Sequence, residues 1–270
     1  MITISQTSVK TFLSQSKIPG YKYVINPYAG CPHRCVYCYA EYMRKFSNHK
    51  EPWGDFLDVR HCDSPLKPSQ LFHARVLLSS VTDPYNPYEC KYEVTRNLLK
   101  QLVSCQAHVH ILTKSALVIR DIELFKQLPQ CEVTLSFSSA DDTLRAQLET
   151  RASSVEDKII ALQTLHTQGL STGVMVAPIM PGLTDWKEII SRTRAHTDHY
   201  TFDSLNMRTA YQRKVLDFIE KHYPHTLPLY TDIYIHENTS YWKNLANEIR
   251  EYTSAEGLNA QLYFPHQPKR

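Results

Sequence analysis

Long apolar runs are missing from this 270-residue chain, and no segment approaches the length that a membrane-spanning helix needs. The first six residues lack the charged start and the apolar core of a secretory signal. The seven cysteines are odd in number and irregularly spaced outside one cluster, which disfavours a framework of disulfides. We therefore expect a protein of the reducing cytoplasm, with no membrane partner.

A strong charge of either sign is also missing. The formal net charge is only +3, far from the basic excess of a dedicated nucleic-acid-binding protein, although it is compatible with an anionic substrate. Low-complexity tracts, an evident linker and repeats longer than a strand–helix unit are absent as well. The 42% hydrophobic content is ample for a core, so the length predicts one large α/β domain or two small ones.

Three cysteines, Cys31, Cys35 and Cys38, form a compact motif with three and then two residues between them. Three thiolates can hold three irons of a [4Fe–4S] cluster, which leaves the fourth iron without a protein ligand. That open iron can chelate the amino and carboxylate groups of S-adenosylmethionine, and an electron from the cluster can then release a 5′-deoxyadenosyl radical. The spacing therefore predicts an iron–sulfur site for radical chemistry.

A structural zinc site is the alternative interpretation of the same cysteines, with His33, His49 or the His61-Cys62 pair completing the ligands. Zinc ligands usually come as two pairs, and no second Cys-x-x-Cys follows at the spacing of a zinc ribbon or finger. The lone triplet leaves zinc one ligand short, which favours the cluster. A non-catalytic zinc or iron–sulfur module that binds nucleic acid stays the competing class.

The Cys31-x3-Cys35-x2-Cys38 motif resembles the signature of the radical S-adenosylmethionine superfamily. Four further segments resemble its branch similar to spore photoproduct lyase, namely Ile25–Cys31, Thr82–Glu89, Leu112–Ser115 and Val176–Asp185. The resemblance covers residues 21 to about 205. It implies an enzyme that uses a [4Fe–4S] cluster, S-adenosylmethionine and a reducing partner such as flavodoxin or ferredoxin. It implies nucleic acid or a nucleotide as the leading substrate class, with peptides and small metabolites as alternatives.

Short aliphatic runs alternate with helical patterns from residue 71 onward, which is typical of βαβ units with a parallel sheet. Six strands are predicted, at Tyr21–Ile25, Val76–Leu78, Val109–Leu112, Glu132–Ser136, Thr172–Val176 and Tyr200–Phe202. Between two of them, a capping box at Ser153-x-x-Glu156 starts a helix that Gly169 ends. Right-handed crossovers would curl such units into an open barrel with its functional loops at the carboxyl ends of the strands. The resemblance implies the same (β/α)6 partial TIM barrel.

Two regions are expected along the chain. Residues 1–207 are predicted to form the partial-barrel domain, with the cluster loop at residues 26–40, and residues 208–270 an α+β extension packed on it. The extension is predicted to contain a helix over Val215–Tyr223, a strand over Leu229–Ile235 and an amphipathic helix over Trp242–Tyr252.

The resemblance assigns residues near the ends of the predicted strands to an S-adenosylmethionine pocket. It places Lys114 at the methionyl end, where an ammonium can pair with the carboxylate as a point charge. It places Ser80, Thr82 and Asp83 in the segment that binds the ammonium of the cofactor. Judged from the residues alone, an ordinary surface lysine is the favoured interpretation of Lys114, and a cap of the turn before Pro84 is the alternative for Asp83.

Four more residues complete the predicted pocket. Ser136 would bond the carboxylate or the ribose, and Arg151, in a Glu149-x-Arg151 segment, would clamp the carboxylate or the ribose region. Ala177 would give the adenine an apolar wall, and Tyr39 would pack beside the cofactor. Without the resemblance, these residues also fit ordinary packing or a surface Glu–Arg pair.

One departure from the lyase concerns the hydrogen-atom donor. The lyase has a cysteine close before its Ser/Thr-Asp segment, whereas this chain has Ser79 and Ser80 there, and the O–H bond of serine is too strong for that role. The 30 residues before Cys31 also form a shorter N-terminal region than in the lyase. Cys90 is the candidate replacement thiol and Tyr85 a candidate phenol donor, and we therefore expect a reaction other than thymine-lesion reversal.

Overall fold

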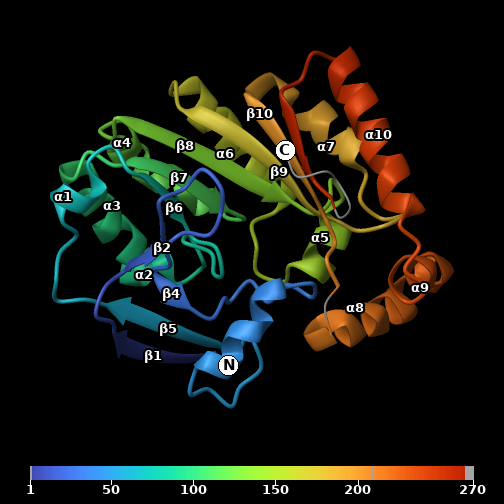
Figure 1. The fold of residues 1–270 in the computed structure, drawn as a ribbon, viewed down its shortest axis with the longest axis horizontal. Helices are drawn as coiled ribbons and strands as arrows, with labels where there is room; N and C mark the ends of the chain where they lie inside the picture. Colours follow the sequence, from blue (N-terminus) through green and yellow to red (C-terminus); the bar gives the residue numbers. More distant parts are fainter. Residues whose placement is uncertain (1, 208, 265–270) are drawn as a thin grey trace.

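The computed structural model describes residues 2–207 and 209–264, which form two β-sheets and the helices around them (Figure 1). The larger sheet has eight strands in the order β11-β10-β9-β8-β7-β6-β3-β2. Their bounds are β2 Leu13–Gln15, β3 Tyr23–Ile25, β6 Arg75–Leu78, β7 His108–Thr113, β8 Gln130–Phe137, β9 Ser171–Ile179, β10 His199–Ser204 and β11 Ala260–Tyr263. All six predicted strands are confirmed as the parallel series β3, β6, β7, β8, β9 and β10.

The two edges of this sheet carry strands beyond the predicted six. Strand β11 pairs with β10 in parallel, and β2 pairs with β3 in antiparallel orientation. The arrangement is a mixed α/β fold whose parallel strands and connecting helices correspond to the (β/α)6 partial barrel.

Helices connect the strands and cover the outer face of the sheet (Figure 1). The helices are α1 Pro68–Leu71, α2 Glu89–Tyr92, α3 Val94–Ser104, α4 Ile122–Phe125, α5 Asp142–Leu148, α6 Val155–Thr167, α7 Trp186–Thr193, α8 Thr209–His222, α9 Leu227–Tyr234 and α10 Ser240–Ala255. Short 3-10 turns are η1 Tyr39–Phe46, η2 Ala116–Asp121, η3 Arg194–His196 and η4 Pro224–Thr226. Within the described residues, no helix combines the length and the apolar character that crossing a membrane requires.

The start of α6 corrects the predicted capping box by one residue. Ser154 is the N-cap: its hydroxyl accepts a hydrogen bond from the backbone N–H of Asp157 at 3.0 Å and donates to the Asp157 carboxylate at 2.6 Å. The hydroxyl of Ser153 instead accepts from the backbone N–H of Ala116. Gly169 follows the helix with a φ of +77°, as the predicted helix end requires.

Alternate residues of the strands point to opposite faces of the large sheet. Val133 and Leu135 of β8 face the helices and belong to the main hydrophobic core. The opposite face of β8 carries polar side chains, among them Glu132 and Ser136. Strand pairing continues this row from Ser136 to Met175 and Thr201, so the inner face of the open barrel is more polar than its outer face.

A smaller sheet holds the segment that leads into the cysteine motif. It has the order β1-β5-β4, with bounds β1 Thr3–Ser8, β4 Tyr28–Ala29 and β5 Phe56–His61. Gly30 follows β4 with a φ of +81°, and a Cβ added there would lie 2.3 Å from the carbonyl oxygen of Phe56. Only glycine fits this close approach, which turns the chain from β4 into the cysteines.

The C-terminal region is helical where a strand was expected. The predicted strand over Leu229–Ile235 is wrong, because α9 occupies this segment and buries Tyr230 and Ile233, three residues apart, as one helix face does. The predicted helices are confirmed as α8 and α10. Helix α8 packs beside η1, close to the cysteine motif.

Candidate active site

The three cysteines lie in a tightly held loop between β4 and η1. Cys31 and Cys35 are buried and Cys38 is half-buried. The backbone N–H of Cys38 donates to the carbonyl of Cys35, and that of Val36 to the carbonyl of Leu148. The loop is therefore fixed both by its own turn and by the last residue of α5.

The chemistry of this loop fits a [4Fe–4S] cluster. Burial raises the pKa of the Cys31, Cys35 and Cys38 thiols, so thiolates there need a cation to compensate their charge. The indole N–H of Trp53 donates to the Sγ of Cys38 at 3.2 Å, a hydrogen bond that suits a sulfur bound to iron. Three soft donors in a nearly water-free setting match three irons of the cluster.

The zinc interpretation finds no fourth ligand at this loop. His49 pairs with Asp58 at 2.8 Å and stacks on Phe56, while His33 faces Asp83, with 3.4 Å between Nδ1 and Oδ2. Across residues 2–207 and 209–264, no three His, Cys, Asp or Glu side chains come close enough together to hold a single metal ion.

Lys114, Ser136 and Ala177, three predicted pocket residues from three strands, meet at one point. The Nζ of Lys114 donates to the hydroxyl of Ser136 at 2.7 Å and to the carbonyl of Ala177 at 3.3 Å. It also lies 2.9 Å from the Oε1 of Glu149. Burial lowers the pKa of Lys114, but the adjacent Glu149 carboxylate outweighs this and the pKa ends up raised, so the ammonium is charged.

A second lysine, Lys158 of α6, lies behind this point and was not predicted. Its side chain is fully buried, its Nζ donates to the backbone carbonyl of Ser136 at 3.0 Å, and the Oε2 of Glu149 is 3.9 Å away. Burial alone would raise the pKa of Glu149, yet Lys114 and Lys158 lower it to about 2. Burial lowers the pKa of Lys158 to about 8. Two ammonium groups thus share one carboxylate, and the buried group carries a net positive charge below that pH.

Asp83 organises the loop after β6 through its carboxylate. Its Oδ1 accepts from the Thr113 hydroxyl at 2.6 Å and from the backbone N–H of Tyr85 at 2.9 Å, and its Oδ2 accepts from the backbone N–H of Lys114 at 2.8 Å. These bonds match the turn-capping alternative from the sequence and fix the backbone at Lys114.

Ser80 and Thr82 tie the same loop to the cysteine segment. The Thr82 hydroxyl donates to the carbonyl of Gly30 at 2.7 Å, and the Tyr39 hydroxyl donates to the carbonyl of Ser80. The hydroxyl of the neighbouring Ser79 is buried and, among the described residues, has no hydrogen-bond partner. Tyr39 thereby connects the cysteine motif to the carboxyl end of β6.

The other predicted residues, Arg151, Tyr85 and Cys90, make no side-chain contact with Lys114, Ser136 or Ala177 that the structure shows. Arg151 is exposed, although its backbone N–H donates to the carbonyl of His33, and Glu149 pairs with Lys114 and not with Arg151 as in the alternative of a surface Glu–Arg pair. Tyr85 is completely buried and donates to Asp121 at 3.0 Å. Cys90 is exposed, with its Sγ 3.0 Å from the carbonyl of Pro87. These placements give no support to Tyr85 or Cys90 as a hydrogen-atom donor.

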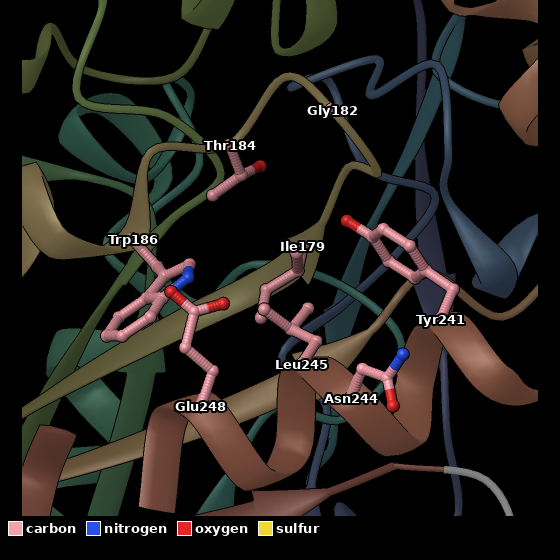
Figure 2. A pocket seen from close by; sticks show the side chains of 8 residues that line it. All are labelled: Ile179, Gly182, Thr184, Trp186, Tyr241, Asn244, Leu245 and Glu248. Carbon is pink, nitrogen blue, oxygen red and sulfur yellow. The ribbon is translucent and has the colours of Figure 1, made fainter. Parts of the chain in front are cut away.

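A cavity of about 350 Å³ lies elsewhere, between the β9–α7 connection and α10 (Figure 2). The indole of Trp186 and the carboxylate of Glu248 face each other across one side of it. Lys187 already engages both groups, with its Nζ 2.7 Å from Glu248 and 5.1 Å from the Trp186 ring centre. No cysteine of the motif lines this cavity, so it is separate from the site described above.

An open parallel barrel that carries a three-cysteine loop beside a buried lysine defines a class of enzyme that works with a metal cluster. Comparison with known protein families identifies which class of cluster enzyme this is. A family model described as the Radical SAM superfamily matches residues 25–192, and the chain belongs to this superfamily. It is a radical SAM enzyme, and its family implies a [4Fe–4S] cluster and S-adenosylmethionine as cofactors.

Relatives extend over most of the chain. An uncharacterized protein of Methanocaldococcus jannaschii is 37% identical over 223 residues, which is 83% of this chain and 85% of the relative. A Pseudomonas phage M6 protein named radical SAM Nalpha-GlyT isomerase is 24% identical over 234 residues, 83% of this chain and 48% of the phage protein.

A solved structure shares the fold. Spore photoproduct lyase, complexed with dinucleoside spore photoproduct, matches with a TM-score of 0.66 at 17% identity, over 97% of this chain and 82% of the lyase. A further structure of that lyase holds bound AdoMet. At this identity the match supports the partial-barrel fold.

Proposed function

We propose that this chain cleaves S-adenosylmethionine reductively and uses the product on nucleic acid or a nucleotide. Cys31, Cys35 and Cys38 would hold a [4Fe–4S] cluster, which when bound supplies the electron and the open iron that generate a 5′-deoxyadenosyl radical. The observation that carries this proposal is the triplet of thiols, buried at Cys31 and Cys35 and half-buried at Cys38, which has no fourth metal ligand among the described residues and lies near Lys114 at the carboxyl ends of the strands.

The chain's own residues would bind and orient the cofactor. Lys114 presents a charged ammonium between Ser136 and Ala177, where it can bind a carboxylate. The Asp83 carboxylate fixes the backbone at Lys114, and Ala177 offers an apolar surface for the adenine. Trp53 stabilises the Cys38 thiolate through its N–H donor.

Carbonyls and hydroxyls after β6 would receive the ammonium of the cofactor. Ser80 and Thr82 lie in this segment, and the unpartnered hydroxyl of Ser79 adds a further polar group. Arg151 lies beside the cysteine loop with its side chain exposed, which leaves its guanidinium available to the carboxylate or ribose of the ligand. Tyr39 would pack against the cofactor at the mouth of the barrel.

The substrate class is supported by one protein of the same fold and by the net charge of this chain. The lyase of the same fold is complexed with a dinucleoside photoproduct, and an anionic substrate suits the slightly positive chain. We propose a nucleotide or nucleic-acid substrate on this basis, with peptides and small metabolites as the alternatives. The electron would come from a small reducing protein such as flavodoxin or ferredoxin, in a reducing cytoplasm that preserves the cluster.

The test is anaerobic reconstitution with iron and sulfide, followed by dithionite and S-adenosylmethionine. Brown protein that produces 5′-deoxyadenosine without any substrate supports the proposal, because reductive cleavage needs only the cluster and the bound cofactor. Replacing Cys31, Cys35 or Cys38 singly by alanine should abolish production, whereas Cys62→Ala, outside the motif, should retain it. Colourless zinc protein, or cleavage retained in all three motif variants, would refute the assignment.

A further inference from the structure

The 3-10 helix η1 carries exposed aromatic side chains directly after the cysteine motif. It begins at Tyr39, with Cys38 as its N-cap, and ends at Phe46. In Figure 1 it is the light-blue helix beside α8. Phe46 is 71% exposed and Tyr42 is 44% exposed, although a phenylalanine ring is ordinarily buried. Exposed apolar side chains that gather on one element indicate a binding surface, whereas scattered ones do not.

The buried row of η1 packs on the cysteine loop. Side chains three apart in a 3-10 helix lie in one row, and Ala40 and Met43 form the row that joins Cys31 and Trp53 in a small hydrophobic core. Trp53 in turn bonds the Sγ of Cys38 through its indole N–H, at 3.2 Å. The helix is therefore part of the wall around the thiols.

The two sides of the cysteine loop have different surroundings. Cys35 and Tyr37 belong to the main hydrophobic core, and the Tyr37 hydroxyl donates to Glu149, the partner of Lys114. Cys31 belongs instead to the small core that η1 covers. The residues around Lys114 thus lie on one side of the loop and η1 on the other. A partner on the outer face of η1 can approach the thiols without occupying the pocket at Lys114.

The exposed charges of this segment have one sign. Within residues 39–50, the exposed charged side chains are those of Arg44, Lys45 and Lys50, whereas Glu41 is half-buried. The Lys45 ammonium lies 5.0 Å from the ring centre of Phe46, and the Nη2 of Arg44 donates to the carbonyl of Lys50 at 2.8 Å. These contacts gather the cations around the exposed ring. An apolar centre among cations is complementary to an acidic protein.

The position of η1 fits an electron donor better than a nucleic acid. At a rise of about 2 Å per residue, Tyr42 lies about 8 Å along the axis from Cys38, so a carrier on this helix comes close to the thiols. Nucleic acid also suits aromatic and basic groups, but a substrate has to reach the cofactor at Lys114, on the other side of the loop. An electron carrier needs only proximity to the cluster.

We infer that the η1 surface, made of Tyr42, Arg44, Lys45, Phe46 and Lys50, docks the small acidic protein that reduces the cluster. Phe46 is the central anchor, and the cations pair with carboxylates of the carrier around it. The reduced carrier loses one electron and the oxidised cluster gains it, while no atom is transferred. This inference rests on the proposed function and assigns its electron donor to one face of the molecule.

Binding is measured first, without electron transfer. An oxidised flavodoxin and an oxidised ferredoxin, both of acidic pI, are titrated into anaerobically reconstituted protein in a calorimeter. For the carrier that binds the wild type, Phe46→Ala and Lys45→Glu should each weaken the affinity at least about tenfold. Phe72→Ala is the matched control, because Phe72 is 66% exposed and follows α1, outside this surface. It should keep the affinity of the wild type.

The same variants are then compared with two electron sources. Production of 5′-deoxyadenosine is driven by a subsaturating amount of the reduced carrier or by excess dithionite, a small ion that needs no docking surface. Phe46→Ala should lose at least about tenfold of the carrier-driven rate and keep the dithionite-driven rate, whereas Phe46→Trp should keep both. Raising the ionic strength from about 0.05 M to about 0.5 M should slow the carrier-driven reaction of the wild type more than that of Lys45→Glu.

Several results would overturn the inference. These are equal losses with the carrier and with dithionite, carrier affinity that is unchanged in Phe46→Ala and Lys45→Glu, or a wild type that neither carrier binds. Weaker binding of a single-stranded oligonucleotide to Phe46→Ala, with carrier affinity unchanged, would make η1 a nucleic-acid surface instead. No 5′-deoxyadenosine from the wild type with dithionite refutes the proposed function, whereas production together with carrier binding that is independent of η1 refutes this inference alone.

Discussion

Lys114 illustrates how one residue combines a structural and a ligand-binding role. Its ammonium is held by Ser136 and Glu149, yet it lies where three strands end, and its backbone is fixed by Asp83. We expect Lys114→Ala to weaken S-adenosylmethionine binding by roughly tenfold to a hundredfold, since a charge-assisted contact contributes about 1.5–3 kcal/mol. The iron content should stay unchanged, because Lys114 is not a cluster ligand.

Equilibrium dialysis with radiolabelled S-adenosylmethionine, together with iron analysis, measures both quantities. Lys126→Ala is the matched control, because Lys126 is an exposed lysine that bonds Gln168 on the outside of the fold. Unchanged affinity in Lys114→Ala would assign this lysine to the structure of the barrel alone.

Lys158 gives a pH-dependent prediction at the same scale. Its pKa falls from 10.5 in the unfolded chain to about 8 in the fold through burial. Between these values the unfolded chain holds a proton that the folded chain has released, so this group makes the free energy of unfolding rise with pH. Below about pH 8 the lysine is protonated in both states and gives no pH dependence.

The measurement is urea unfolding of the wild type and of Lys158→Met at about pH 7.5 and about pH 9.5. The difference between the two proteins cancels the titration of cysteines and tyrosines that both contain. The wild type should gain on the order of 2 kcal/mol relative to the variant across this range. A difference that is independent of pH would show that Lys158 is not held with a lowered pKa.

Some site residues could be predicted from the local sequence, whereas others depend on the tertiary structure. The predicted strand ends brought Lys114, Ser136 and Ala177 to one face, the resemblance assigned them to one pocket, and the three residues do meet. Lys158 has a usable signal, three residues after Val155 and four before Leu162 on the buried stripe of α6, but a lysine in such a stripe is ordinarily exposed. The partner of Glu149 could not be predicted, because choosing Lys114 over Arg151 depends on the tertiary position of the loop.

At the scale of elements, the strongest periodic segments were predicted well and the short ones were not. Leu229–Ile235 is mostly apolar, with only Thr231 and Asp232 as polar residues, and so short a run does not distinguish a strand from a buried helix turn. Strands β1 and β5 form their sheet across about fifty residues of chain, so no local pattern of either strand indicates the pairing. The wrongly predicted strand and the unpredicted small sheet both lie outside the parallel series of strands that carries the site, and that series was predicted.

The N-cap of α6 offers a test of an element boundary. Ser154→Ala removes the hydroxyl that accepts from Asp157 and should lower the free energy of unfolding by about 1 kcal/mol. Thr164→Ala, at an exposed position inside the same helix, should cost little or nothing, because alanine has the higher helix propensity. Chemical unfolding, monitored by circular dichroism, distinguishes the two variants. Equal stability of Ser154→Ala and the wild type would show that Ser154 is not the N-cap and would favour Ser153, as predicted from the sequence.

At the scale of the whole molecule, the chain shares the lyase fold over almost all of its length. It differs in having serines where the lyase-like pattern has the cysteine that donates a hydrogen atom. Ser79 and Ser80 follow β6 where the lyase-like pattern has its cysteine nearby, and the Ser79 hydroxyl is buried. Cys90 is exposed in α2 and bonded within its own turn. A radical on a repaired thymine would therefore lack a thiol positioned to donate a hydrogen atom.

We accordingly expect little or no repair of spore photoproduct, in a dinucleotide or in DNA, by reconstituted protein that still cleaves S-adenosylmethionine. Chromatographic separation of photoproduct and thymidine products measures repair, and 5′-deoxyadenosine on the same sample shows that the cluster is active. Installing a thiol by Ser80→Cys tests the argument directly: if the donor alone is missing, this variant should gain repair that the wild type lacks. Efficient repair by the wild type that survives Cys90→Ala would mean that the absent cysteine does not decide the reaction. If neither protein repairs the lesion, the absent thiol is not the only difference from the lyase.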